Sequence, residues 1–209
     1  GEKNLGSATV YLEVDGKGFN QKSLNTIVKG EVKQLAYNGY NYKKVNIDGR
    51  MKWPYFKGRI DSNDPNLLMS FDGLVDMSKK RKEYDFHAKI DYANLALLKI
   101  MKKDTLSIFK GDLVFKASGD NLNDLAGKLE VTQLSYQNSK GDYYFEDFAV
   151  ESVFDEENVR TITINSTDII EGHVRGKYDT KEVKKLVENA LGSLYANYSP
   201  HKLKPGQFL

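Results

Sequence analysis

Histidines, acidic side chains and glycine turns are the groups in this sequence that could do chemistry. The three histidines, His87, His173 and His201, lie far apart, and none has the spacing of a metal-ligand pair or a nucleophile motif. No glycine cluster matches a phosphate-binding loop or a dinucleotide-binding fingerprint. The chain has no cysteine, which excludes thiol catalysis and thiolate metal sites. We therefore expect no metal, no cofactor and no nucleotide chemistry.

Paired acids occur in three turn-like stretches, "IDSNDPN", "DEEN" and "GDYYFEDF". Asp or Asn next to Gly or Pro most often hydrogen-bonds its own backbone in a turn. A calcium loop would need a bidentate Glu at an offset that "DSNDPN" does not offer. A hydrolase built on a β-scaffold, with two carboxyl groups about 5 to 9 Å apart, is the enzymatic alternative. No residue pattern favours it, and we expect no enzyme.

Two further features could bind a ligand. The basic run "KKRKEY" at residues 79–84 could contact phosphate groups, although four cations in a tight turn usually form a solvated tip. The 13 tyrosines could stack on bases or sugars, although strand tyrosines more often pack on cross-strand neighbours. The 31 basic and 29 acidic side chains are interspersed and leave a net charge of +2, so we expect no nucleic-acid partner.

The elements that would position these groups are strands. Apolar and polar residues alternate along most of the chain, as in "ATVYLEVDG" and "LLMSFDGLVDM", and clusters of Gly, Asn, Asp and Lys separate the runs. No run of about 18 apolar residues that could span a bilayer is present. The pattern predicts an all-β fold: a meander of antiparallel strands, each with one apolar face.

Two segments break the alternation. Residues 181–197 carry apolar side chains at helical spacing, with Thr180 as N-cap and Pro200 beyond the end, which predicts one C-terminal amphipathic helix. The stretch "DYANLALLKIMKKD", which begins at Asp91, is too short for its periodicity to decide between a short helix and a bulged strand.

The chain shows internal similarity at a spacing of about 100 residues. "VKQLAYNGYNYKKVNIDG" from Val32 is echoed by "VTQLSYQNSKGDYYFEDFAVES" from Val131. The segments that follow share an order of features: a strand ends at a serine, an aspartate follows, and the next strand has a central glycine. These are Ser62, Asp64 and Gly73 in one copy and Ser166, Asp168 and Gly172 in the other. We predict a single elongated β-rich domain over residues 1–209, built from two similar sheet units, about 26–100 and 126–179.

One helix cannot cover the apolar faces of so many strands, so the sheet must curl on itself. It would either close into a sandwich or barrel core, or fold like a taco around an apolar groove. A groove of this kind could take acyl chains, at about 0.8 kcal/mol for each buried methylene. The side chains expected to line it occupy alternate strand positions: Val45, Ile47, Leu67, Met69, Phe71, Val75, Phe86, Ile90, Phe148, Val150, Ile162 and Ile164.

The stretch "LAYNGYNYKKVNIDGRMKWPYFKGRIDSNDPNLLMSFDGLVDMSKKRKEYDFHAKIDYANLALL" resembles the TamB proteins of the translocation and assembly module, within the AsmA-like group. The shared pattern is Leu-x-Tyr-x-Gly-x-x-Tyr, then Gly, then Asp-Pro-Asn, then Phe-x-Gly-x-Val-Asp. "VRTITINSTDIIEGHVRGKYDTKEVKKLVENALGSLYANYSP" is similar to the same branch, including its helix. The resemblance covers roughly residues 26 to 200 and consists of strand and turn motifs rather than catalytic ones.

The resemblance implies a large envelope protein that is anchored in the inner membrane and reaches across the periplasm. It implies a long, strongly curved antiparallel β-taco sheet with an apolar inner groove and no catalytic residue. The implied partners are phospholipid or an outer-membrane protein client, together with an outer-membrane barrel of the BamA-like class. On this reading the chain is a fragment, and both the membrane anchor and the domain that meets the barrel lie outside it.

The alternation of the strands together with the resemblance favours a non-enzymatic periplasmic segment with a conduit or spacer role. Its groove would shield phospholipid acyl chains or client strands during outer-membrane lipid transport or outer-membrane protein assembly. The alternative is a surface binding module for glycan or protein, with solvent-facing tyrosines and a closed β core. The two hypotheses differ in whether the apolar strand faces stay open or close on protein.

Overall fold

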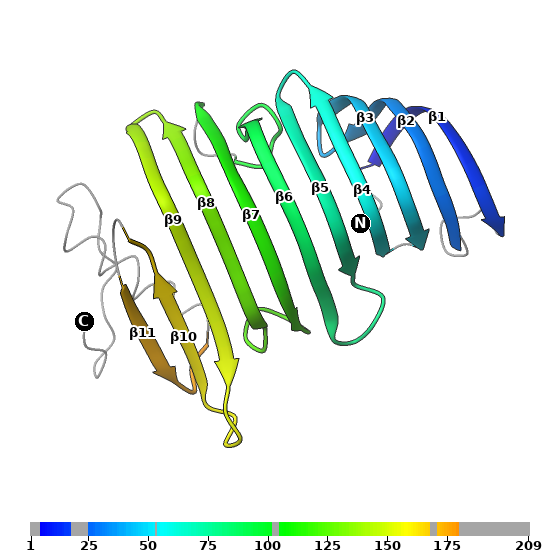
Figure 1. The fold of residues 1–209 in the computed structure, drawn as a ribbon. Coiled ribbons are helices and arrows are strands. Elements are labelled where there is room, and N and C mark those ends of the chain that lie inside the picture. The colour runs from blue at the N-terminus through cyan, green and yellow to red at the C-terminus, as the bar shows by residue number, and fades with distance from the viewer. Residues whose placement is uncertain (1–4, 18–24, 53, 102–104, 168–170, 180–209) are drawn as a thin grey trace.

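In the part of the chain that the computed structural model describes, eleven strands form one antiparallel sheet (Figure 1). The structure describes residues 5–17, 25–52, 54–101, 105–167 and 171–179. Strand order in the sheet is the order along the chain, and every neighbouring pair is antiparallel. The strands are β1 (Leu5–Lys17), β2 (Asn25–Tyr37), β3 (Tyr40–Lys52), β4 (Tyr55–Asp64), β5 (Leu67–Asp76), β6 (Lys82–Asn94), β7 (Ser107–Gly119), β8 (Ala126–Asn138), β9 (Gly141–Phe154), β10 (Arg160–Asn165) and β11 (Glu171–Gly176).

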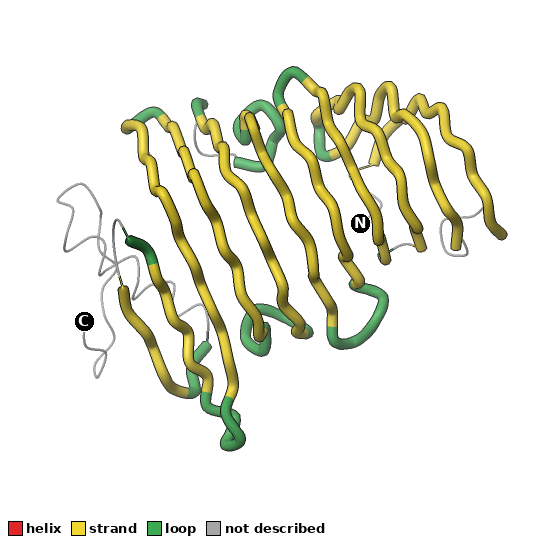
Figure 2. Tube along the Cα trace, viewed as in Figure 1, coloured by secondary structure: helices red, strands yellow, loops and turns green. Residues whose placement is uncertain are grey.

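The predicted all-β meander is confirmed. The sheet is elongated and curved, and it is not closed, because β1 and β11 lie at opposite edges (Figure 1). The described residues contain no helix (Figure 2), and the helix expected at residues 181–197 lies outside them. Within the same described ranges, no helix is long and apolar enough to cross a membrane.

The stretch from Asp91 combines a bulged strand with a compact turn. The pairing of β6 with β7 shifts register between Ile90 and Ala93, and the strand continues to Asn94. Hydrogen-bonded turns follow, in which the N–H of Leu98 donates to the carbonyl of Asn94 at 2.9 Å. The bulged-strand alternative is therefore correct for the first half, and the apolar second half is a turn rather than a helix.

The register aligns side chains in rows that cross the sheet. Alternate residues of a strand lie on the same face, so each row belongs to one face. Arg59, Asp72 and His87 pair across β4, β5 and β6 in a polar row, which defines what we call the outer face. An apolar row on the opposite, inner face runs from β2 to β9 through Gly30, Ile47, Ile60, Phe71, Ala88, Leu113, Val131 and Phe148.

The inner face is only partly covered. The buried apolar side chains of the strands are small, such as Ala88 and Val131, whereas Ile47 and Phe71 are half-buried. The larger rings pack on their neighbours within the face, and the Phe71 and Phe86 centroids lie 5.0 Å apart. No second layer lies over the inner face within the described residues, and its larger side chains stay half-buried.

A row of glycines allows three strands to approach closely on the inner face. Gly49, Gly58 and Gly73 pair across β3, β4 and β5. A Cβ atom at Gly73 would lie 2.3 Å from the carbonyl oxygen of Asp85, and the residue has a φ of +143°. The Phe56 ring covers the space above Gly49, where an added Cβ would lie 3.1 Å from it. Glycine kinks filled by neighbouring aromatic rings are a means of curving a sheet.

The predicted unit of about 26–100 spans β2–β6 and that of about 126–179 spans β8–β11, and the compared motifs lie in β2–β5 and β8–β11. Val32 lies in β2 and Val131 in β8, while Gly73 and Gly172 lie within β5 and β11. Asp168 lies outside the described residues. The strands thus match in order, and the origin of the two units as an internal repeat stays a prediction.

The glycine row yields a stability prediction. Gly73→Ala should lower the free energy of unfolding by about 2–4 kcal/mol, because the new methyl group meets backbone atoms and φ is in the region that favours glycine. Gly172→Ala is the matched control, because a Cβ there meets nothing within 4 Å. The control should change stability by less than about 1 kcal/mol in urea unfolding followed by circular dichroism. Equal effects of the two variants would contradict the role of the row.

Candidate functional site

All twelve side chains that were expected to line a groove lie on the inner face, and all are half-buried. The register brings neighbours together: Ile47 lies in the same row as Phe71, and Val150 pairs with Ile164. Their part in binding a ligand stays a prediction. By strand they are Val45 and Ile47 of β3; Leu67, Met69, Phe71 and Val75 of β5; Phe86 and Ile90 of β6; Phe148 and Val150 of β9; and Ile162 and Ile164 of β10.

The prediction missed inner-face residues of β4, β7 and β8 that complete the same rows. Leu113 of β7 pairs with Ala88 and with Val131, and Phe115 pairs with Phe86. Phe86 and Phe115 lie 5.5 Å apart, edge to face. The same two-residue alternation is present in β7 and β8, so it could have identified these residues.

Two shallow hollows are lined mainly by outer-face residues of neighbouring strands. One, of about 360 Å³, is lined by Val131 and Phe148 together with charged neighbours. The other, of about 370 Å³, lies around Ile47 and includes Arg59 and Asp61. Both are open and mixed in polarity, unlike the enclosed pockets that bury most of a small substrate. The extended apolar rows are therefore the stronger candidate site.

The end of the sheet where β2–β3, β4–β5 and β6–β7 are connected is called the upper lip (top in Figure 1). A buried carboxylate there, that of Asp64, joins the start of β3 to the β4–β5 turn. The Tyr40 hydroxyl donates to Asp64 at 2.6 Å, and the Lys43 N–H and the Asn66 N–H each donate to it at 2.8 Å. Burial, and then the bond to Asp64, raise the pKa of Tyr40. Since β3 pairs with β4 only from Val45 onward, this carboxylate replaces the missing backbone ladder. Asp64, the second acid of "IDSNDPN", thus stabilises the fold.

The histidines and other acids form no metal centre in the part of the chain that the structure describes, where no group of three or more potential ligands occurs. His87 Nε2 lies 2.5 Å from Asp112 Oδ1 on the outer face. His173 is exposed in β11, and His201 lies outside the described residues.

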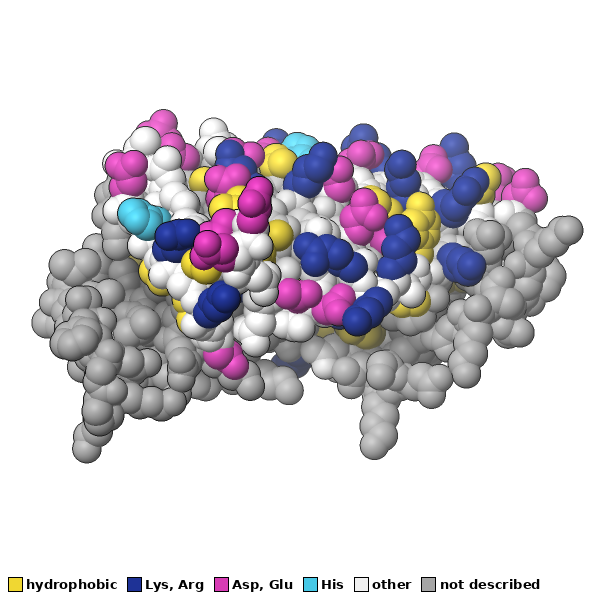
Figure 3. Space-filling view, turned by 90° about the horizontal axis from the view of Figure 1, so that it is seen from below, with side chains coloured by type: hydrophobic (Ala, Val, Ile, Leu, Met, Phe, Trp, Pro, Cys, Tyr) yellow, Lys and Arg dark blue, Asp and Glu magenta, His cyan; other side chains and the backbone are white. Residues whose placement is uncertain are grey.

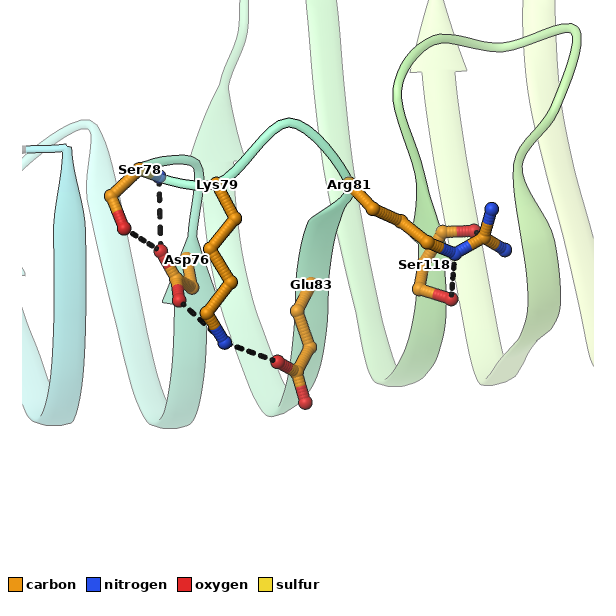
Figure 4. A network of polar contacts seen from close by, with 6 residues as sticks. All are labelled: Asp76, Ser78, Lys79, Arg81, Glu83 and Ser118. Carbon is orange, nitrogen blue, oxygen red and sulfur yellow. Dashed lines mark hydrogen bonds and ion pairs between the residues drawn. The ribbon is translucent and has the colours of Figure 1, made fainter.

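The basic run at residues 79–84 is bonded to the rest of the lower lip, the opposite end of the sheet (Figure 4). Lys79 Nζ lies 3.3 Å from Asp76 and 3.4 Å from Glu83. Arg81 donates to the hydroxyl and to the carbonyl of Ser118, both at 3.2 Å, and Lys82 donates to the carbonyl of Asp120. Seen from below (Figure 3), cations and anions are interspersed rather than gathered by sign. Three of the four cations thus stabilise the turn.

The Asp76 carboxylate yields a pH prediction. The Ser78 hydroxyl donates to it at 2.5 Å, and this bond is the main cause that lowers the pKa of Asp76. A carboxyl group whose pKa is lower in the folded state than in the unfolded state stabilises the fold at pH values above its unfolded-state pKa. This stabilisation is lost as the pH falls through the folded-state pKa. Asp76→Asn should therefore lose stability at pH 7. The difference from the unchanged chain should shrink as pH falls below 3.8 in unfolding titrations, and a pH-independent difference would contradict this origin.

At the lower lip, a buried arginine at the start of β10 holds the β7–β8 turn against the end of β9. Arg160 is only 6% exposed, and its guanidinium donates to the Ser152 hydroxyl at 2.8 Å and to the Leu122 and Leu125 carbonyls at 2.9 Å. Burial lowers the pKa of Arg160. The planar group supplies several donors in fixed directions, which a lysine cannot reproduce.

Replacing Arg160 tests whether its hydrogen bonds stabilise the turn. Arg160→Lys should cost about 1–3 kcal/mol of unfolding free energy, because carbonyls of a distant turn lose their donors. Arg175→Lys is the control, because Arg175 makes one exposed ion pair, 2.7 Å from Asp155, and a lysine keeps the charge. Its effect should stay within about 0.5 kcal/mol by urea unfolding. Equal losses in both variants would show that the buried bonds do not stabilise the turn.

Comparison with known protein families, with curated proteins and with solved structures finds no match to this chain. The site is therefore interpreted from its own geometry, and the TamB-like resemblance stays a prediction.

Proposed function

We propose that this chain is a non-enzymatic segment whose inner face shields the acyl chains of phospholipids from water. The observation that carries the proposal is the continuous apolar row across β3–β9, whose larger side chains are half-buried and which has no second layer over it in the described residues. An apolar sheet face that no second layer covers is a candidate binding surface.

The length of the apolar row suits an extended acyl chain. Neighbouring strands lie about 4.8 Å apart, so a row that crosses seven strands is roughly 29 Å long. The hydrocarbon core of a whole bilayer is about 30 Å thick, so one acyl chain needs about half that length. Shielding ten methylenes at about 0.8 kcal/mol each contributes roughly 8 kcal/mol before entropic losses, equivalent to a Kd near the micromolar range. The row is therefore long enough and apolar enough for the task.

The competing functions have less support. The surface module for glycan or protein depends on a closed β core, whereas the sheet is open. A hydrolase would need free carboxyl groups, but Asp64 accepts three hydrogen bonds and Asp155 accepts backbone N–H groups in its own turn. These carboxylates are used by the fold.

The resemblance to TamB proteins supports a wider setting for this activity. In that setting the chain is a periplasmic conduit or spacer within an envelope protein anchored in the inner membrane. It would pass phospholipid toward the outer membrane, or shield the strands of an outer-membrane protein during assembly. A BamA-like barrel would be contacted by regions beyond this chain.

Titration with a phospholipid that carries an environment-sensitive fluorophore on an acyl chain tests the inner face. Leu113→Asp places a carboxylate in the apolar row and should weaken binding by at least about tenfold. Val114→Asp is the matched control: it is the next residue, 45% exposed, and paired with His87 on the outer face. The control should bind like the unchanged chain.

A second inner-face variant, Phe71→Gln, keeps the test decisive if Leu113→Asp fails to fold, which circular dichroism would report. Phe71 contacts the rings of Phe56 and Phe86, which lie in other rows of the same inner face. Probe binding that is unaffected in a folded inner-face variant, or weakened equally by Val114→Asp, would exclude the inner face as the acyl site.

A further inference from the structure

The turn after β6 exposes large apolar side chains at the upper lip. Within residues 95–101, Leu97 is 49% exposed, Ile100 is 58% exposed and Met101 is 37% exposed. These side chains belong to neither the inner-face rows nor the outer-face rows, because β6 ends at Asn94. Three exposed apolar residues in seven are unusual for a turn, where Gly, Asn, Asp and Ser normally dominate.

The turn is held in a defined shape. Leu98 is fully buried beneath it, and the Leu97 N–H donates to the Asn94 side-chain oxygen at 3.1 Å. The Ile100 N–H donates to the Leu95 carbonyl at 3.0 Å. The Asn38 amide of the β2–β3 hairpin donates to the Lys99 carbonyl at 3.3 Å, so two distant connections meet here. Leu98 thus anchors the turn while its neighbours point their apolar groups outward.

The charge around this turn is positive. Residues 95–101 contain no acidic residue, and Lys99 is exposed. The adjoining hairpin adds the exposed Lys43 and Lys44, while the carboxylate of Asp64 is buried and bonded. At the opposite lip, by contrast, the most exposed apolar residue, Leu122, lies between Asp120 and Asp124 in sequence. The β5–β6 connection at the lower lip also carries cations, but its exposed apolar side chain is a single methionine, Met77, whereas residues 95–101 expose three.

We propose that residues 95–101 dock on an anionic phospholipid bilayer surface. Leu97, Ile100 and Met101 enter the boundary between headgroups and acyl chains, and the Lys99 ammonium binds lipid phosphate. Apolar side chains combined with flanking cations are the chemistry that binds anionic membrane surfaces. The proposal is independent of the acyl groove, because none of these residues lies on the inner face.

Vesicle flotation with the full chain tests this docking. The unchanged chain should float with vesicles of phosphatidylglycerol and phosphatidylcholine, and less with vesicles of phosphatidylcholine alone. Leu97→Asp combined with Ile100→Asp should reduce the bound fraction by at least about fivefold. Leu122→Asp is the matched control: it changes the most exposed leucine at the other lip, 69% exposed, and should bind like the unchanged chain.

A second variant, Lys99→Glu, tests the electrostatic part and should weaken binding to the anionic vesicles most strongly at low salt. Failure of the unchanged chain to float with anionic vesicles would overturn the proposal, as would flotation that the Leu97 and Ile100 changes leave intact. Flotation lost equally in Leu122→Asp would also overturn it. Acyl-probe binding by the same preparations separates the outcomes, because a chain that binds the probe but not the vesicles retains the groove and lacks the docking turn.

Discussion

The backbone ladder of a single, long antiparallel sheet is the constraint on which the rest of the structure depends. Each strand from β2 to β10 is held by hydrogen bonds to two neighbours, the edge strands β1 and β11 to one, and no second layer covers the sheet within the described residues. Because side chains alternate between faces, one register decides the position of every apolar group. A shift by one residue in any strand would place its apolar residues among the charges of the outer face.

Side chains on the outer face and at the two lips support the backbone ladder in different ways. Exposed cross-strand pairs such as Lys29–Asp48 and Lys116–Asp85, each at 3.3 Å, match opposite charges across neighbouring strands. Each contributes at most about 1 kcal/mol, so their main effect is to favour the correct register. The buried groups at the lips contribute more individually, because Asp64 and Arg160 satisfy backbone groups that would otherwise lack partners. These bonds fix the strand ends while the inner face stays apolar.

Sequence reasoning predicted the faces of the strands well because two-residue alternation is a local property. It placed Ile47, Phe71 and Ile164 on one face, and the register agrees. It could not predict the part played by Arg160, whose acceptors include carbonyls 35 and 38 residues away along the chain. The turn after β6 was equally beyond local periodicity, since its shape depends on Leu98 being buried and on the distant Asn38. Polar contacts between distant turns have no sequence period from which they could be predicted.

An apolar inner face that shields acyl chains can be tested most directly by photocrosslinking in cells, with a photoreactive amino acid introduced at one position at a time. Ile60, Phe71 and Leu113 lie on the inner face, and the adjacent Arg59, Asp72 and Val114 lie on the outer face. If the inner face holds lipid, mass spectrometry should find phospholipid adducts at the first three positions and only background at the other three. Adducts without this alternation, or protein adducts alone at the inner positions, would contradict an acyl-chain groove.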